Sequence, residues 1–504
     1  ISNLLEALLS LISQEKKVVD GVAIPEQIEF PISPASEAFA EVLICEIALK
    51  NRDRLAMIWY NHLGSHYHNR LDTLTKTFVE SEKELLTRIS GSIEKAVTGL
   101  LRVSYFSLKR GEIANDVLST WSLLDSCVND EKKQCLLDVL DRHIGEGLWR
   151  ITRCVDDSSK LSDTGWHGIL SLIRWSVYRG ASLPSISSSH TGRSVGLADD
   201  DPSIQVYRSL HYLLNVSEAK SQVPSVVSGC IHLLVITGDK RNCPKLSVAG
   251  LDLLQVLNNL VEGNAIARKE DVQFTMEMRD LFWKKNWLPV IENFASVSNL
   301  SPNPAVRQHA LSILTDSFLD KEAGLLPVEI LCEVLGKVCV PLAGDRIIKL
   351  RRGIRHPEQL DGMMAEVELC VSLIFKPLRH HMKTIVSERS SLLSAVWMPT
   401  LNAINAILAE DTLEDNPSSQ TPEGQKMIQA TNELTIEHLK NVVMVLISFG
   451  VLETPLEASA ESSSISSKTW TSMEEIIVLK KFVDEWKDAA AKPPKNLYGA
   501  SVED

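Results

Sequence analysis

The sequence has few of the features that mark a disulfide-stabilised or membrane-spanning protein. Its nine cysteines are scattered over 504 residues with no Cys-x-x-Cys pair, which disfavours zinc ribbons and disulfide scaffolds and fits free thiols in a reducing compartment. No uninterrupted apolar run approaches the roughly 18 residues needed to span a bilayer, and no signal-peptide pattern opens the chain. We therefore expect a cytosolic protein, free or peripheral to a membrane.

The common catalytic motifs are also missing. The chain contains no phosphate-binding P-loop, no Gly-x-Ser-x-Gly elbow, no His-Glu-x-x-His motif and no Gly-x-Gly-x-x-Gly fingerprint. A net charge of −13 does not suit a protein that coats nucleic acid. His62 and His66 have the spacing by which two imidazoles can hold zinc, but no third ligand accompanies them. We expect no active site, cofactor, bound metal or nucleic-acid partner in this segment.

Helical periodicity is what the sequence does contain, almost throughout. Apolar residues recur at three- and four-residue intervals, and sustained period-two alternation is hard to find. Short polar breaks between the periodic stretches predict helical hairpins, and hence an all-α HEAT/armadillo-like solenoid with tetratricopeptide-like helical repeats. The helices are predicted at 36–50, 82–108, 115–127, 131–155, 166–177, 203–214, 223–237, 245–261, 271–294, 304–318, 391–408 and 425–450.

The clearest helix start lies at residues 301–311. Asn303 can cap the helix, and Pro304 fits the first helical position, where no amide donor is needed. The Val-Arg-x-x-Ala-Leu stretch that follows is similar to the second helix of HEAT and armadillo repeats. Composition then divides the chain into helical repeats at 1–180, a polar linker at 181–203, further repeats at 204–452, a disordered Ser/Glu-rich linker at 453–472, and a terminal helix and tail at 473–504.

Two stretches are candidates for membrane contact. Leu8 and Leu9 lie on the apolar face of the opening helix, where core packing is the favoured use and lipid the alternative. A basic, apolar-interleaved run either lies on anionic headgroups or forms a loop whose arginines pair with acids, and the second interpretation is favoured. This run consists of Arg346, Lys349, Arg351, Arg352 and Arg355.

A polar corner interrupts the apolar stretch between Glu41 and Trp59. The pattern predicts one helix, a charged turn at Asn51-Arg52-Asp53-Arg54, and a second helix that begins near Leu55. Asn51 or Asp53 can cap the second helix, and the two arginines can bridge acids or fasten the corner. A structural corner is therefore favoured over a site of chemistry.

Three stretches resemble sequence motifs of a known family. Residues 43–54 are followed by Ile58 and Trp59, residues 96–102 read Ala-Val-Thr-Gly-Leu-Leu-Arg, and Gly-Trp opens the helix at 165–172. In this order they resemble the first homology region downstream of the catalytic domain in the large Golgi-type Arf guanine nucleotide exchange factors, the brefeldin A-resistance factor and GNOM family. The residues that carry the resemblance are Asn51, Arg52, Asp53, Arg54, Trp59, Gly99, Arg102 and Trp166.

The resemblance is strongest over residues 36–180. Two departures are a longer polar segment at 60–95 and the missing proline-rich tail of animal members. The resemblance implies a non-catalytic, C-terminal regulatory and membrane-targeting scaffold of an Arf exchange factor in Golgi vesicle traffic. In that family a catalytic domain uses a glutamate finger, which no residue here inherits.

The implied partners are Golgi membrane lipids and small GTPases or tethers, with a homodimer as a further option. The implied location is the cytosol, peripheral to Golgi membranes. The alternative is a helical-repeat adaptor of another trafficking or transport complex.

Overall fold

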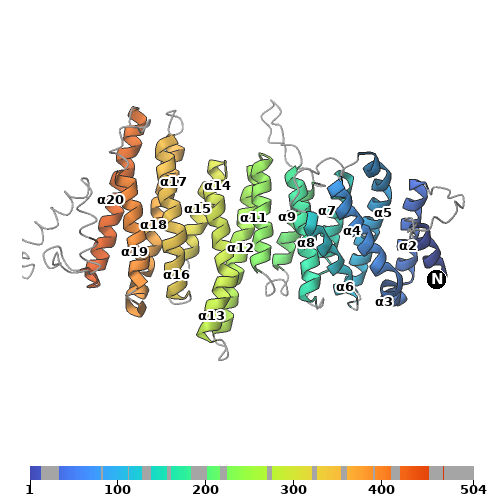
Figure 1. Cartoon of the computed structure of the whole chain (residues 1–504). Helices are drawn as coiled ribbons and strands as arrows, with labels where there is room; N and C mark the ends of the chain where they lie inside the picture. Colours follow the sequence, from blue (N-terminus) through green and yellow to red (C-terminus); the bar gives the residue numbers. More distant parts are fainter. Residues whose placement is uncertain are drawn as a thin grey trace, which may run out of the picture. The chain divides into compact units, whose positions relative to one another are not determined.

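Helices make up every regular element in the described part of the chain. The computed structural model describes residues 1–12, 33–80, 83–109, 111, 113–127, 138–155, 161–182, 201–215, 224–269, 275–319, 326–353, 360–389, 392–409, 421–452 and 469. This confirms the predicted all-α solenoid (Figure 1). The contacts between helices divide the chain into two compact units, unit 1 from Ile1 to Leu260 and unit 2 from Val261 to Asp504.

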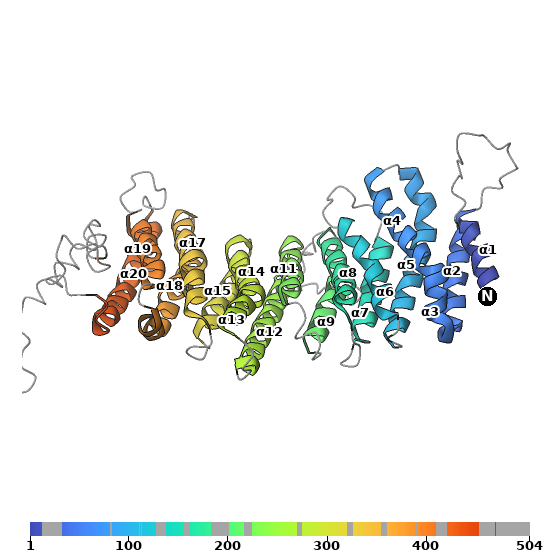
Figure 2. The same ribbon diagram turned by 60° about the horizontal axis from the view of Figure 1, so that its bottom comes forward.

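Unit 1 stacks its helices in two layers. In one layer α2, α5, α7 and α9 pack in succession, and in the other α4, η3, α8 and α11 do the same (Figure 2). The elements of this unit are α1 (Ser2–Ile12), α2 (Pro34–Lys50), the 3-10 turn η1 (Arg52–Arg54), α3 (Leu55–Ile58), the π turn η2 (Trp59–Leu63), α4 (Gly64–Glu80), α5 (Lys83–Leu108), α6 (Ala114–Ser119), the 3-10 turn η3 (Thr120–Cys127), α7 (Asp138–Thr152), α8 (Asp163–Ser182), α9 (Pro202–Asn215) and α11 (Pro224–Lys240).

Unit 2 repeats the two-layer plan. Here α15, α18 and α20 pack in one layer, and α14, α17 and α19 in the other. Helix α12 (Pro244–Lys269) carries the boundary between the units. The elements that follow it are α13 (Met276–Phe282), the π turn η4 (Trp283–Trp287), α14 (Leu288–Leu300), α15 (Pro304–Leu319), α16 (Val328–Val334), the π turn η5 (Leu335–Cys339), α17 (Val340–Gly353), α18 (Leu360–Arg389), α19 (Leu393–Ala409) and α20 (Pro422–Ser448).

Proline explains where two of the helical runs change their winding. The predicted helix at 271–294 is divided by η4, and η5 divides the run from Val328 to Gly353. Pro289 and Pro341 are each the second residue of the helix that follows the π turn. Proline lacks the amide donor of an i→i−4 hydrogen bond. The turn before each proline accommodates this missing bond by adopting the wider π winding.

The packing of the tryptophans supports the solenoid core. Trp283 and Trp287 of η4 lie edge-to-face with their ring centroids 5.7 Å apart, and Trp287 meets Phe318 at the same distance. In unit 1 the indole of Trp121 donates to Ser104 Oγ at 2.9 Å. Trp149 is half-buried. The buried tryptophans are Trp59, Trp121, Trp166, Trp175, Trp283, Trp287 and Trp397.

The predicted start of α15 is confirmed. Asn303 Oδ1 accepts a hydrogen bond from the amide of Ala305 at 2.9 Å, and Pro304 is the first helical residue. Val306 and Leu314 then face the interior of unit 2. The capped, proline-initiated start therefore fixes which face of α15 turns inward.

A buried carboxylate joins three helices of unit 2. Arg307 of α15 donates through Nε and Nη2 to the two oxygens of Glu366 in α18, at 2.9 and 3.0 Å. Arg346 of α17 donates through Nε to the same carboxylate at 2.6 Å. Two guanidinium groups thus neutralise a carboxylate that would be costly to bury alone.

The structure contains helices that were not predicted from the sequence. Helices α4, α16, α17 and α18 fall in stretches for which no helix was predicted, and Thr120–Cys127 is a 3-10 turn rather than the end of an α-helix. The predicted linker at 181–203 is described only at its two ends. The predicted segments 453–472 and 473–504 lie outside the described residues, apart from Thr469.

Candidate functional site

The charged corner closes α2. Asn51 Nδ2 donates to the carbonyl of Ile47 at 2.7 Å, and the Asn51 amide donates to the same carbonyl at 3.1 Å. No side-chain cap bond is made at the start of η1 or α3. Asn51, one of the two cap candidates for the helix near Leu55, therefore caps the end of the preceding helix instead, and Arg54 occupies the N-cap position of α3. Its amide group satisfies a carbonyl that the end of α2 leaves free.

Arg52 fastens this corner to α5. Its Nε donates to the carbonyl of Leu49 at 3.1 Å, and its guanidinium lies 5.0 Å from the centroid of the Phe106 ring. Trp59, just beyond the corner, is buried and stacks on Tyr67 with ring centroids 6.1 Å apart. Asp53 and Arg54 are exposed. The corner thus links α2 to α5, and Trp59 just after it links η2 to α4.

The stretches at 43–54 and 96–102 form two sides of one helix interface. A Cβ added to Gly99 would lie 3.3 Å from Cys45 Cβ and 2.9 Å from the hydroxyl oxygen of Tyr67, so glycine permits the close approach of α2 and α5. At the edge of this interface Arg102 Nη1 pairs with Glu46 Oε1 at 2.7 Å. Burial lowers the pKa of Arg102, but its hydrogen bond to Glu46 together with the electrostatic interactions with Cys45, Glu46 and Tyr67 outweighs burial, and the net shift of the pKa is upward.

The third stretch lies at a second close helix crossing. Trp166 is buried in α8, and a Cβ on Gly168 would come 1.9 Å from the carbonyl oxygen of Leu118. Ser162, just before α8, donates its amide to Asn115 Oδ1 at 2.8 Å. These glycine contacts place α8 directly against α6.

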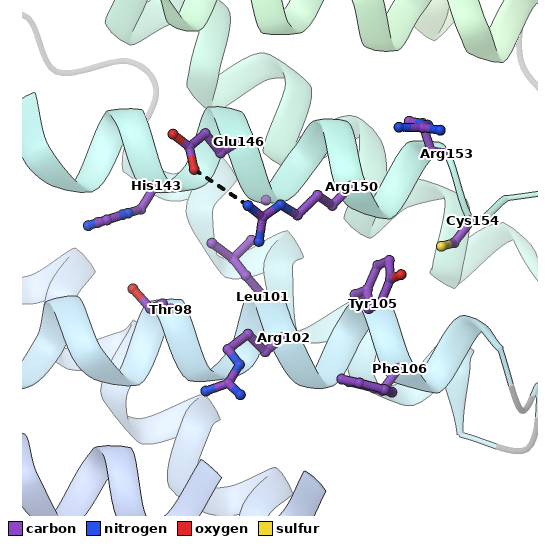
Figure 3. A pocket seen from close by; sticks show the side chains of 11 residues that line it. Thr98, Leu101, Arg102, Tyr105, Phe106, His143, Glu146, Arg150, Arg153 and Cys154 are labelled. Atoms are coloured by element: carbon purple, nitrogen blue, oxygen red, sulfur yellow. Dashed lines mark ion pairs between the residues drawn. The ribbon is translucent and has the colours of Figure 1, made fainter. Parts of the chain in front are cut away.

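A groove of about 570 Å³ lies next to this motif interface, between α5 and α7 (Figure 3). Both helices present residues at three- and four-residue spacing, so one stripe from each faces the groove. Helix α5 contributes Thr98, Leu101, Arg102, Tyr105 and Phe106, and α7 with the turn after it contributes His143, Glu146, Gly147, Arg150, Arg153 and Cys154.

Cations outnumber acids in the groove lining. Arg150 is exposed, and its ion pair with Glu146 spans 4.0 Å (dashed in Figure 3), so this pair contributes little. Arg153 contacts the ring of Trp149 at 5.6 Å and has no carboxylate partner among the residues that the structure describes. Among the residues that the structure describes, three arginines thus line the groove and Glu146 is the one acid in its lining.

The floor of the groove is apolar and aromatic. A Cβ on Gly147 would lie 2.7 Å from both terminal methyl carbons of Leu101, so Leu101 packs directly on the glycine and the two helices approach closely there. The ammonium of Lys109 lies 4.5 Å from the centroid of Tyr105. The hydrogen bond to Tyr105 raises the pKa of Lys109, which therefore stays cationic. Such a surface can bind an anionic, partly apolar ligand.

Two comparisons with known proteins agree on a family. A family model described as the GBF1-like tetratrico peptide repeat region matches residues 287–478. The Arabidopsis thaliana protein "ARF guanine-nucleotide exchange factor GNL1" is 22% identical over 437 residues, which are 83% of this chain and 25% of that protein. The chain is related to the Arf guanine nucleotide exchange factors. It spans about a quarter of the length of this relative.

This relationship confirms the resemblance predicted from the motifs of unit 1. The family model matches the later part of the chain, where fewer sequence motifs of the family were recognised. Among solved structures, a "Circular tandem repeat protein with novel repeat topology and enhanced subunit contact surfaces" covers 97% of this chain and 93% of its own, at 12% identity and a TM-score of 0.37. A structural similarity with so low a TM-score carries no argument.

The described part of the basic run, residues 346–353, is helical and not a loop. Arg351 is fully buried in α17 and donates to the carbonyl of Ile407, so the proposed lipid contact is wrong for this residue. Arg346 pairs with Glu366, and exposed Lys349 donates to Asn299 Oδ1 at 3.1 Å. Arg355 and the side chain of Arg352 lie outside the described residues.

The opening helix buries Leu8, so the favoured core interpretation holds for that residue. Leu9 is half-buried. Leu4 and Leu11 are the leucines of α1 that face outward, at 52% and 45% exposure. No helix in the described ranges is long and apolar enough to cross a bilayer.

The histidines singled out for metal binding have other partners. His66 Nε2 bonds to the buried carboxylate of Glu41 at 2.9 Å, and His62 Nε2 lies 3.3 Å from Ser2 Oγ. His381 bonds to the carbonyl of Phe318 at 2.7 Å. Over the described parts of the chain, no three metal-ligating side chains come together.

Sequence reasoning found Arg102 but missed the rest of the groove. His143, Glu146, Arg150 and Arg153 follow helical spacing within the predicted helix at 131–155, which was the available signal. The spacing does not say which neighbour this face meets. That depends on the packing of α7 against α5.

Proposed function

We propose that this chain is the non-catalytic, C-terminal regulatory and membrane-targeting scaffold of an Arf exchange factor that acts in Golgi vesicle traffic. The observation that carries the proposal is the alignment with the Arabidopsis exchange factor over 83% of the chain. The proposed partners are Golgi membrane lipids and small GTPases or tethers. The scaffold would work at the Golgi surface from the cytosol, either alone or as a homodimer.

Two features support a scaffold rather than a catalyst. The matching family model is that of a repeat region, and repeat arrays present extended binding surfaces. The main groove of unit 1 is lined by exposed arginines with aromatic side chains, a combination suited to binding. Catalysis of GDP release would then belong to another part of an Arf exchange factor.

An exchange assay tests this division of labour. Arf loaded with a fluorescent GDP analogue is mixed with the 504-residue chain or with the longest natural polypeptide that contains it. We expect faster GDP release only with the longer polypeptide. Faster release with the chain alone would overturn the scaffold assignment, and no effect of the longer polypeptide would overturn the link to exchange.

The outward leucines of α1 provide a test of membrane contact. Aspartate at an exposed apolar position introduces a charge that opposes insertion into the headgroup region. We expect Leu4→Asp with Leu11→Asp to reduce sedimentation of the chain with anionic, Golgi-like liposomes. The matched control is Met276→Asp with Leu300→Asp, which changes two exposed apolar side chains of unit 2. Equal sedimentation of all three proteins would remove α1 from the account.

A further inference from the structure

The groove between α5 and α7 has a charge opposite to that of the chain as a whole. The net charge of the chain is −13, whereas the described residues of the groove lining carry three arginines, one glutamate and a histidine that lies 3.4 Å from Glu94 Oε1. A local basic surface on an acidic protein favours the approach of an anionic partner and repels most others. Charge complementarity therefore indicates an acidic ligand.

The groove arginines keep their binding capacity. Arg150 is 70% exposed, and its contact with Glu146 is at the limit of an ion pair. Arg102 shares the carboxylate of Glu46, and 45% of its side chain stays accessible. A guanidinium has five donors in a planar fork, so one pairing leaves donors for a second carboxylate.

The basic and polar side chains are distributed along the groove rather than gathered at one point. His143 and Arg153 lie at opposite ends of the lining that α7 and its following turn provide (Figure 3). Their separation of ten positions corresponds to about 15 Å at the rise of an α-helix. This length equals roughly four to five residues of an extended chain. It exceeds what a single phosphorylated headgroup needs.

The floor supplies a second kind of recognition. Leu101 packs against Gly147 and lines the groove, and half-buried Tyr105 and Phe106 line it beside Leu101. An apolar or aromatic side chain of a ligand would lose water on this floor while its acidic neighbours meet the arginines. A headgroup carries no such side chain.

We propose that the α5–α7 groove binds an extended acidic segment of a partner protein, in which Asp or Glu residues flank an apolar or aromatic side chain. The carboxylates pair with Arg102, Arg150 and Arg153, and the central side chain packs on Leu101 and Tyr105. This proposal names a partner class beyond lipids and GTPases. Its test does not depend on exchange activity.

Binding of a labelled peptide to the purified 504-residue chain tests the proposal. The probe has glutamates on both sides of a central phenylalanine, and fluorescence anisotropy reports its affinity. We expect Arg150→Glu with Arg153→Glu to weaken binding about tenfold or more, because both substitutions place like charges against the peptide. The matched control, Lys240→Glu with Lys337→Glu, makes the same change of net charge on exposed lysines outside the groove and should leave the affinity unchanged.

Two further measurements separate the parts of the proposal. A peptide with serine in place of phenylalanine should bind several-fold more weakly, because it cannot use the apolar floor. A benzophenone at that position should crosslink to residues of α5 or α7, which locates the site even if a variant fails to fold. Circular dichroism checks the folding of each variant.

Five results would overturn the proposal. Four of them are no binding of the probe, equal weakening by the control pair, crosslinks confined to other helices, and no difference between the phenylalanine and serine peptides. The fifth is that the chain binds phosphoinositide-containing vesicles more tightly than it binds the peptide, and that this binding depends on Arg150. That result would assign the groove to lipid headgroups instead.

Discussion

The arginines that line the groove of unit 1 differ in use from the arginines in the interior of unit 2. In unit 2 Arg307 and Arg346 turn inward to the carboxylate of Glu366, and Arg351 is buried against the carbonyl of Ile407. In unit 1 the arginines at 102, 150 and 153 line an open groove. Arg346 and Arg351 of the conspicuous basic run therefore hold the fold, whereas the less conspicuous Arg150 and Arg153 are available to a ligand.

The buried carboxylate of Glu41 in unit 1 is paired by residues that do not line the groove. Glu41 is fully buried and accepts from Arg70 Nε at 2.8 Å and from His66 Nε2 at 2.9 Å. Packing of α2 and α4 therefore does not require the arginines of α5 and α7. Partners and burial, rather than the local density of positive charge, distinguish a structural arginine from a binding one.

The largest expected effect is the loss of the Glu366 carboxylate. Glu366→Ala leaves two arginines facing each other in the interior of unit 2, and we expect the free energy of unfolding to fall by about 3 to 5 kcal/mol. Glu41→Ala should cost less, because one of its partners is a histidine that can be neutral. Urea denaturation compares the two. A larger loss for Glu41→Ala would contradict this view of the units.

Next in size is the helix crossing of unit 1 at Gly168. In Gly168→Ala the new methyl group would lie 1.9 Å from the Leu118 carbonyl oxygen, and we expect a loss of about 3 kcal/mol as α8 is displaced. Gly229→Ala is the control, since no atom lies within 4 Å of its added Cβ, and alanine should stabilise α11 by about 0.5 to 1 kcal/mol. Equal melting temperatures for the two variants would show that the crossing is not tight.

A smaller contrast compares single arginines of the two units. Arg351→Ala removes a buried side chain and the donor to Ile407, and we expect a loss of about 2 kcal/mol. Arg153→Ala changes an exposed side chain and should leave stability nearly unchanged. Thermal denaturation measures both. Equal losses for the two variants would remove the distinction between structural and binding arginines.

The smallest effect concerns two half-buried histidines, one in each unit. Burial lowers the pKa of His232 below its usual 6.5, and burial is also the main cause that lowers the pKa of His438. The unfolded chain therefore takes up a proton at a higher pH than the folded one, so stability falls as the pH drops below 6.5. We expect His232→Gln or His438→Gln to lose less stability than the parent between pH 7 and pH 5 by about 1 kcal/mol or less. Parallel stability curves would contradict the cause assigned to these shifts.

The fold follows from the sequence wherever a start signal and an apolar stripe coincide. Asn303, Pro304 and the stripe from Val306 to Leu314 predict α15 correctly. The sequence around α16 and α17 is harder to interpret, because the π turn at Leu335–Cys339 shifts the helical spacing between its two sides. Treating 346–355 as a loop then hides the fact that Arg351 lies one turn after buried Ile347 and shares its face.

The candidate site depends on information that local patterns do not contain. Gly99 and Arg102 could be identified from the family motif at 96–102. The structure adds that Gly99 lies against Cys45, and Arg102 pairs with Glu46, across one interface. The groove needs α5 and α7 side by side, with Gly147 over Leu101. No spacing within either helix specifies that contact. Asn51 was one of two cap candidates for the second helix and closes α2 instead, because a cap residue between two helices can serve either one.

Hydrogen–deuterium exchange of the full chain, with and without the acidic peptide, is the most direct test of the difference between the units. If the groove of unit 1 binds the ligand and the arginines of unit 2 hold the fold, the peptide should slow exchange in residues 98–109 and 141–154. Exchange in α15, α17 and α18 should stay unchanged. Protection centred on α17 and α18, with none in α5 and α7, would contradict the account.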